Sequence, residues 1–128
     1  MIQTKELKQG NYVLDKNGKR LLVYCITLNG IKTFESGLFK GNGTEYSYFH
    51  IMPITITQEI LLKCAFEKSS DNQTFFINHF GFCLVYDGMD WCLKMRIDEP
   101  YVICYVKYLH ELQNLFFSIT KKELEINF

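Results

Sequence analysis

Three histidines, His50, His79 and His110, are the side chains best suited to transfer a proton near neutral pH. Nucleophilic catalysis would also require a nucleophile and an orienting group within reach of one of them. None of the three lies in a G-x-S-x-G segment or in a Cys/His signature. His110 has Asn114 one helical turn later, and a hydrogen bond from His110 to a neighbouring strand is the alternative to a functional role. We therefore expect no enzymatic activity.

Four carboxylates flank two expected turns, Asp87 and Asp90 at the first and Asp98 and Glu99 at the second. A carboxylate pair could serve glycoside hydrolysis or hold a cation. Alternate turns of an antiparallel meander lie at opposite ends of the sheet, so the two groups are not expected to meet. Asp is also favoured by turn geometry itself. We expect turn residues here, with no metal site and no cofactor.

The five cysteines are an odd number, and none forms a C-x-x-C pair, so a structural zinc site is not expected. Most lie in apolar, strand-like runs, where a free thiol behaves as a small hydrophobic group. Buried free thiols are the main expectation; disulfides or a reactive thiol are the alternatives. The five positions are Cys25, Cys64, Cys83, Cys92 and Cys104.

Aromatic residues are the most unusual part of the composition, with 11 Phe, 8 Tyr and 1 Trp. A tyrosine buries its ring while presenting a polar tip, which suits stacking on a planar ligand. The same residues are enriched at protein interfaces. The structural alternative is an aromatic-rich β core, and Trp91 in particular is expected to lie in that core.

The elements that position these residues begin with hairpins. A strand at Tyr12–Leu14 leads into the turn D-K-N-G at 15–18, and Asn-Gly is a strong hairpin signal. The return strand covers 21–28, and a second Asn-Gly turn at 29–30 precedes a strand at 31–34. This meander predicts an SH3-like, barrel-like N-terminal lobe. The Gly-rich stretch 37–43 lacks a phosphate-loop pattern and is expected to be an ordinary connection.

Beyond Pro53, Thr57 is a plausible N-cap for a short linking helix that ends near Ala65. Four strands follow at regular spacing and predict an antiparallel meander. Their expected ranges are 74–78, 82–86, 91–97 and 101–106. In the third strand, Trp91, Leu93, Met95 and Ile97 should face the core, whereas Cys92, Lys94, Arg96 and Asp98 should face a wetter side.

A C-terminal helix is predicted over 107–119. Its apolar stripe of Leu109, Leu112, Phe116 and Ile119 should pack across the meander. A second stripe of His110, Asn114 and Phe117 lies beside it. The tail after residue 121 should add a short strand or remain unpaired. The fold class is therefore α+β, with a barrel-like lobe at 1–52 and a helix, sheet and helix at 53–128 that share one compact domain.

The overall charge excludes several partners. The chain has 128 residues with 14 Lys and Arg against 14 Asp and Glu, so its formal net charge is zero. Nucleic-acid binders show basic patches, because neutralising phosphates supplies much of their affinity. No signal peptide and no apolar run of about 20 residues is visible. We expect a cytoplasmic protein that binds neither extended nucleic acid nor membrane.

Three segments, Lys5–Val13, Pro53–Lys68 and Lys107–Ile126, together resemble a family of small uncharacterised proteins of bacteria, prophages and phages. The family patterns are R-I-G-N-x-V, P-I-P-L-T-E-E-W-L-L-K-F-G-F-E-K and Y-V-H-Q-L-Q-N-L-Y-F-A-L-T-G-E-E-L. The sequence departs from them at Gln9, Thr55, Ile60 and Cys64, which are packing or surface changes. The resemblance implies no activity; it implies a phage-associated protein of the host cytoplasm, a setting in which modulators of host enzymes or of defence signalling are common.

Function is thus expected to be binding without catalysis. The first hypothesis is a phage-type protein that sequesters a small nucleotide-derived signal to counter host defence, in an aromatic pocket that an oligomer of this chain could complete. The alternative is a protein-interaction module that inhibits or adapts a host protein. The residues expected to bind the ligand are Tyr86, Lys94, Arg96, Tyr101, His110, Asn114 and Phe117.

Overall fold

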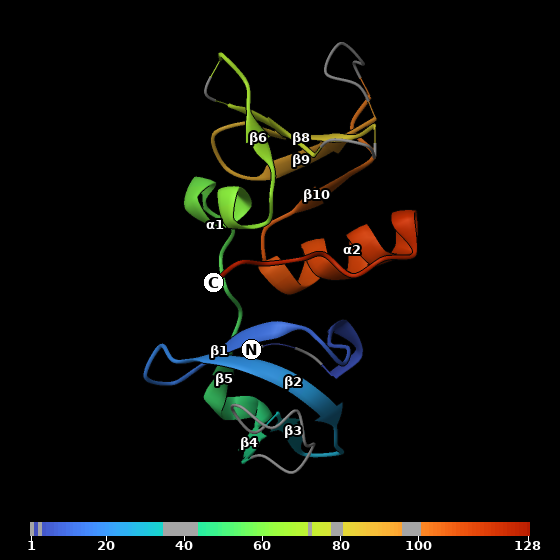
Figure 1. Ribbon diagram of the computed structural model, residues 1–128. Helices are drawn as coiled ribbons and strands as arrows, with labels where there is room; N and C mark the ends of the chain where they lie inside the picture. Colours follow the sequence, from blue (N-terminus) through green and yellow to red (C-terminus); the bar gives the residue numbers. More distant parts are fainter. Residues whose placement is uncertain (1, 3, 35–43, 72, 78–80, 96–100) are drawn as a thin grey trace. The chain divides into compact units, whose positions relative to one another are not determined.

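The computed structural model describes residue 2 and the ranges 4–34, 44–71, 73–77, 81–95 and 101–128 (Figure 1). These residues form two antiparallel sheets of five strands each and two α-helices. The α+β class predicted from the sequence is confirmed. The Gly-rich stretch 37–43, His79 and the segment from Arg96 to Pro100 lie outside the described residues.

The chain divides into two compact units. The N-terminal unit contains Met1–Thr55 and Tyr108–Asn114, and the C-terminal unit contains Ile56–Lys107 and Leu115–Phe128. The sequence places the boundary near residue 52 and assigns the whole C-terminal helix to the second lobe. In the structure, residues 108–114 instead group with the N-terminal unit. The physical reason is hydrogen bonding, because side-chain amides of this segment bond to the N-terminal strands and loops.

The N-terminal sheet has the strand order β4-β3-β2-β1-β5. Its strands are β1 (Tyr12–Asp15), β2 (Arg20–Ile26), β3 (Gly30–Thr33), β4 (Glu45–Ser47) and β5 (Ile51–Met52). The first three confirm the predicted hairpins. β2 pairs with β1 and also with β3, with a register shift between Val23 and Cys25, while β5 returns to pair with β1. The sheet is barrel-like, as the hairpins predict, and β4 and β5 join the three predicted strands.

Short elements and close backbone approaches complete the N-terminal unit. The 3-10 helix η1 (Thr4–Glu6) precedes β1, and η2 (Tyr48–His50) connects β4 to β5. Asp15 Oδ1 accepts hydrogen bonds from the backbone N–H groups of Asn17 and Lys19 and so shapes the first hairpin turn. Glycine is required at Gly30, since a Cβ there would lie 1.8 Å from the carbonyl oxygen of Tyr46 in β4.

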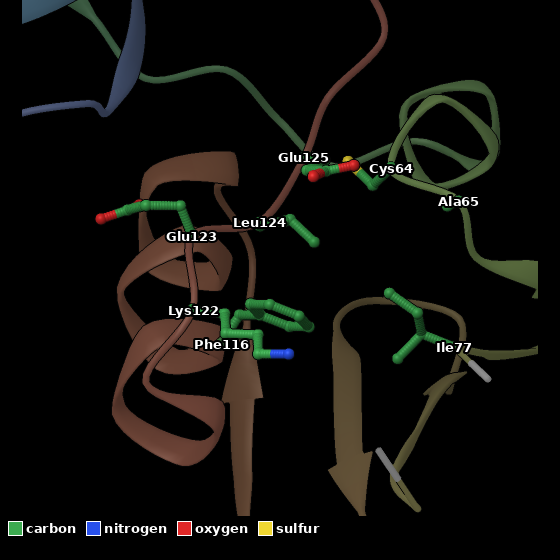
Figure 2. A pocket seen from close by; sticks show the side chains of 8 residues that line it. All are labelled: Cys64, Ala65, Ile77, Phe116, Lys122, Glu123, Leu124 and Glu125. Atoms are coloured by element: carbon green, nitrogen blue, oxygen red, sulfur yellow. The ribbon is translucent and has the colours of Figure 1, made fainter. Parts of the chain in front are cut away.

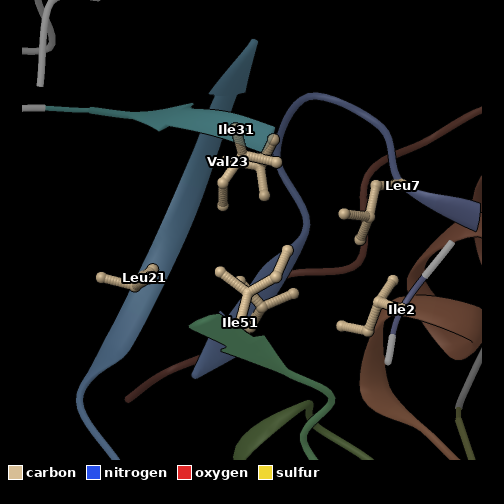
Figure 3. Packing of buried hydrophobic residues seen from close by; sticks show 7 residues of the cluster. Ile2, Leu7, Leu21, Val23, Ile31 and Ile51 are labelled. Carbon is tan, nitrogen blue, oxygen red and sulfur yellow. The ribbon is translucent and has the colours of Figure 1, made fainter. Parts of the chain in front are cut away.

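The core of the N-terminal unit is aliphatic (Figure 3). Side chains from β1, β2, β3, β5 and the segment before β1 meet there and are almost fully buried. They are Ile2, Leu7, Val13, Leu21, Val23, Ile31 and Ile51. Leu109 and Leu112, from the part of the C-terminal helix that belongs to this unit, are also fully buried.

The C-terminal unit holds the second sheet, with strand order β10-β9-β8-β7-β6. The predicted four-stranded meander corresponds to β7 (Thr74–Phe76), β8 (Cys83–Tyr86), β9 (Trp91–Lys94) and β10 (Cys104–Val106); β6 (Glu67–Lys68) adds a fifth strand. The linking helix α1 (Gln58–Lys63) begins as predicted, because Thr57 Oγ1 accepts a hydrogen bond from the Ile60 N–H.

The C-terminal helix α2 (Leu109–Thr120) contributes only its second half to the C-terminal unit. Phe116 packs edge-to-face against Phe82, with 6.1 Å between ring centroids. Ile119, predicted to share the buried stripe, is 40% exposed, so that prediction is wrong at the last turn. The tail after α2 is neither a strand nor unpaired, since the Asn127 N–H donates to the Lys63 carbonyl oxygen.

The predicted alternation of β9 is wrong at Cys92 and Met95. Trp91, Cys92 and Leu93 are all buried, whereas Met95, expected in the core, is 46% exposed. β9 is a central strand of this sheet, so neighbouring side chains cover Cys92 from both sides. Small residues on a sheet face are buried by their neighbours even where that face borders water.

Candidate functional site

The residues predicted to bind a ligand belong to both units. His110 and Asn114 belong to the N-terminal unit, and Tyr86, Lys94, Tyr101 and Phe117 belong to the C-terminal unit. Arg96 lies outside the described residues. Neither unit brings the whole predicted set together, and the stripe of His110, Asn114 and Phe117 is divided by the unit boundary.

Asn114 is engaged in packing the N-terminal unit. Its Oδ1 accepts a hydrogen bond from Asn11 Nδ2 at 2.9 Å, and its Nδ2 donates to the Glu6 carbonyl oxygen at 2.8 Å. Both ends of the amide therefore contact the protein. A ligand would have to displace these bonds, which makes Asn114 a structural residue in this fold.

His110 is buried, with 1% of its surface exposed. Its ring stacks on Tyr108 at 5.9 Å between centroids and 9° between planes, and its Nε2 lies 3.8 Å from the Glu6 carboxylate. Within the described residues neither ring nitrogen forms a hydrogen bond, so the expected bond to a strand is not found. Burial lowers the pKa of His110, although Glu111 and Glu6 oppose that effect. A buried neutral imidazole is a poor partner for a phosphate.

Tyr86, at the end of β8, is 36% exposed. Its ring lies against Trp91 at 5.1 Å, and its hydroxyl donates to the Gly88 carbonyl oxygen at 3.0 Å within the β8–β9 turn. Trp91 is a core residue, as predicted, because it is buried, contacts Phe75 edge-to-face and directs its Nε1 toward the Ile56 carbonyl oxygen at 3.4 Å. The two aromatics together stabilise the turn.

Carboxylates of the C-terminal unit form turns, as predicted for Asp87. Its Oδ1 accepts from the N–H groups of Met89 and Asp90, and these bonds lower the pKa of Asp87. Asp71 accepts hydrogen bonds from Ser69, Gln73 and Thr74, and these bonds lower its pKa. The Asp71 carboxylate thus closes the turn before β7.

An exposed apolar stripe runs along residues 101–105, which lead into and enter β10, the terminal strand of the C-terminal sheet. Tyr101, Ile103 and Tyr105 are 76%, 53% and 60% exposed. The residues between them are covered to a greater extent, and Val106 is buried. This period of two is typical of a strand with one face toward water. The stripe contains one predicted site residue, Tyr101, and two that were missed.

Strand pairing extends this stripe across the sheet. In one row across the sheet, Tyr105 of β10 pairs with Cys92 of β9, which pairs with Val85 of β8. In a second row, Lys94 of β9 pairs with Cys83 of β8, which pairs with Phe76 of β7. Directly paired residues point to the same side of a sheet. Burial raises the pKa of the Cys83 and Cys92 thiols. The positive charge of Lys94 partly opposes this increase, in agreement with its place on the same side of the sheet. We call this surface the β10 face and define it by Phe76, Val85, Lys94, Tyr101, Ile103 and Tyr105.

The signal for the β10 face was present in the sequence. Large residues occupy every second position from 101 to 105. A similar alternation from 91 to 97 is longer and is the stronger pattern in the sequence. Exposure depends on the place of a strand within its sheet. β10 is terminal whereas β9 lies between two strands, so Trp91 and Leu93 of β9 are buried while Tyr105 of β10 is open to water.

Fold and site together describe a small α+β protein with a barrel-like unit and a meander sheet that presents an apolar, tyrosine-containing face. No family model, curated protein or solved structure matches this chain. In the part of the chain that the structure describes, no helix is long and apolar enough to cross a bilayer. Among those same residues, no three His, Cys, Asp or Glu side chains gather as metal ligands.

Proposed function

We propose that this chain is a non-enzymatic binding protein that docks another protein through the β10 face. The observation that carries the proposal is the stripe of Tyr101, Ile103 and Tyr105, three large side chains exposed at alternate positions in the terminal strand β10 and the segment that leads into it. Apolar surface in water is unfavourable by about 25 cal/mol per Å², and contiguous patches mark interaction sites. Tyrosine is also enriched among the residues that dominate binding energy.

The chemistry of the β10 face indicates the kind of partner. Its centre is apolar, its tyrosines add hydroxyl groups, and Lys94 supplies one positive charge. A complementary surface would place apolar side chains against Ile103 and a carboxylate opposite Lys94. The family resemblance suggests a bacterial host protein as this partner, with the chain acting as a phage-type inhibitor or adaptor.

A nucleotide-derived signal is the second candidate. It would stack on the same tyrosines and pair a phosphate with Lys94. His110 and Asn114, two polar groups expected to help it, are buried or hydrogen-bonded in the N-terminal unit. The described residues therefore favour a protein partner over a nucleotide.

The test compares two exposed aromatic residues in different units. Tyr105→Lys places a charge at the centre of the β10 face, whereas Phe49→Lys alters an equally large ring that is 81% exposed in the N-terminal unit. The full-length protein is used as bait in bacterial lysate, and captured proteins are quantified by mass spectrometry. We expect Tyr105→Lys to weaken capture of a wild-type partner by roughly thirtyfold or more, the effect of losing a dominant contact residue. Phe49→Lys should leave that capture unchanged.

Both variants change exposed side chains, so their melting temperatures should match that of the wild type, which serves as the folding control. The proposal is wrong if the wild type captures nothing or if both variants capture as the wild type does. A thermal-shift screen with cyclic and linear nucleotides separates the second candidate. A rise in the wild-type melting temperature that Tyr105→Lys abolishes would assign the face to a nucleotide.

A further inference from the structure

A separate pocket of about 550 Å³ lies within the C-terminal unit (Figure 2). It shares no residue with the β10 face. Its volume falls in the range of about 300–1,000 Å³ that is usual for small-molecule sites. The lining residues come from the end of α1, the segment after β7, α2 and the tail. They are Cys64, Ala65, Ile77, Phe116, Lys122, Glu123, Leu124 and Glu125.

Most of the pocket wall is apolar. Cys64, Phe116 and Leu124 are buried residues, and Ile77 faces them from the end of β7. Burial raises the pKa of the Cys64 thiol to about 12, so this side chain stays neutral and acts as a small hydrophobic group. The edge-to-face contact with Phe82 holds the Phe116 ring in place. This wall suits an aliphatic chain or an aromatic ring.

The tail that forms one side of the pocket is held by its own contacts. The Lys122 N–H donates to Thr120 Oγ1, and that hydroxyl donates to the Phe116 carbonyl oxygen. At the far end, the Asn127 N–H donates to the Lys63 carbonyl oxygen at 2.8 Å, and the Lys63 ammonium lies 5.9 Å from the centre of the Phe128 ring. The tail is therefore fixed at both ends, so the pocket is formed before any ligand binds.

The charges around the pocket are asymmetric. Figure 2 shows the Lys122 ammonium directed into the space bordered by Phe116 and Ile77, and the Glu123 carboxylate directed away from it. Among the described residues Lys122 forms no ion pair with a carboxylate. Glu125 lies toward Cys64, at the other end of the pocket. The Lys122 ammonium, which pairs with no carboxylate of the described residues, thus faces an apolar space, with one carboxylate at the opposite end.

We infer that this pocket binds a monoanionic amphipathic small molecule. Its chain or ring would lie against Phe116, Leu124 and Ile77, and its single carboxylate would pair with Lys122. A second negative charge on the ligand would approach Glu125 and is disfavoured. The pocket is thus a site for a fatty-acid-like or arylcarboxylic ligand, in addition to the protein-binding face.

The probe is decanoate, titrated into the full-length protein by calorimetry below its micelle concentration. Decylamine has the same chain with the opposite charge and should bind more weakly. Lys122→Gln should weaken decanoate binding by up to roughly fivefold, the effect expected from losing a solvent-bordered ion pair. The matched control is Lys68→Gln, an exposed lysine of β6 in the same unit, which should leave binding unchanged.

A second variant tests the apolar part of the site. Ile77→Trp places a larger side chain in the pocket and should abolish decanoate binding without a large change in melting temperature, since Ile77 is only half-buried. The inference is overturned if decanoate produces no heat of binding, or if decylamine binds more tightly. It is also overturned if Lys122→Gln and Lys68→Gln affect binding equally. These lysine and ligand comparisons decide the matter even if Ile77→Trp does not fold.

Discussion

Asn11 and Asn114, 103 positions apart in the sequence, are joined by a hydrogen bond from Nδ2 of the first to Oδ1 of the second at 2.9 Å. Asn11 is buried, and its own Oδ1 accepts from the Lys8 N–H. The Asn114 amide also donates to the Glu6 carbonyl oxygen. These bonds fasten the first half of α2 to the barrel-like unit, so the N-terminal unit is complete only when a segment from the far end of the chain has joined it.

This relationship predicts a measurable coupling. Asn11→Ala and Asn114→Ala should each lower the free energy of unfolding by about 1–3 kcal/mol, because each leaves buried polar partners without a hydrogen bond. The double variant should cost less than the sum of the two, since the bond between them is lost only once. Urea denaturation of the wild type, the two single variants and the double variant measures these losses. Strictly additive losses would show that the Asn11–Asn114 bond contributes nothing.

Gln113 joins the same part of α2 to the N-terminal unit through two further hydrogen bonds. Its Oε1 accepts from the Tyr12 N–H, and its Nε2 donates to the Gly10 carbonyl oxygen, both at 2.9 Å. Gln113→Glu replaces the donor by a carboxylate oxygen facing a carbonyl oxygen, so at pH 7 it should destabilise more than the loss of one hydrogen bond, by more than about 1 kcal/mol. Because a protonated Glu can donate, the difference from wild type should shrink toward pH 4. Urea unfolding at pH 7 and pH 4 measures this difference in stability. A Gln113→Glu variant as stable as the wild type at pH 7 would contradict the prediction.

The fold was predictable where local chemistry decides it. The D-K-N-G turn, the Thr57 cap and the helical spacing of Leu109, Leu112 and Phe116 each act within a few residues, and each predicted its element. β5 and β6 were not predictable, because a strand of two residues has no period of its own and exists only through pairing with a neighbour.

The site was less predictable because it depends on distant partners. Helical spacing correctly places His110 and Asn114 near one another on α2, but it cannot show that Glu6 and Asn11 occupy that side of the helix. The exposed stripe of β10 depends likewise on its terminal position in the sheet. Tertiary context therefore determined which of the candidate side chains remained available to a partner.

Two residues adopt the left-handed conformation that favours glycine, Ala65 at φ +65° and Lys121 at φ +61°. Both follow a helix, Ala65 after α1 and Lys121 after α2. A side chain in this region costs about 1–2 kcal/mol, whereas the extra chain entropy of glycine costs about 0.5–1 kcal/mol. Ala65→Gly and Lys121→Gly should therefore each raise the free energy of unfolding by up to about 1 kcal/mol.

Thermal and urea unfolding measure this gain, and the position of the substitution provides the control. Ser118→Gly introduces the same residue inside α2, where it should lower stability by about 0.5–1 kcal/mol. Opposite signs for Ser118→Gly and Lys121→Gly, three residues apart, would show that backbone conformation and not glycine itself decides the outcome. A loss of stability in Lys121→Gly would contradict the assignment of left-handed strain.

His110 should make the protein less stable in mild acid. Burial lowers its pKa in the folded state below the usual value of about 6.5, against the opposing charges of Glu111 and Glu6. The unfolded chain then binds a proton more readily than the folded protein, so this contribution to stability is complete above about pH 6.5 and is lost as the pH falls through the folded pKa. His110→Phe keeps a ring to stack on Tyr108 and cannot titrate. Urea midpoints from pH 7.5 to 5.0 should therefore fall more steeply for the wild type than for His110→Phe. Equal slopes would mean that His110 titrates alike in both states, and an NMR titration of its ring would then show a pKa near 6.5.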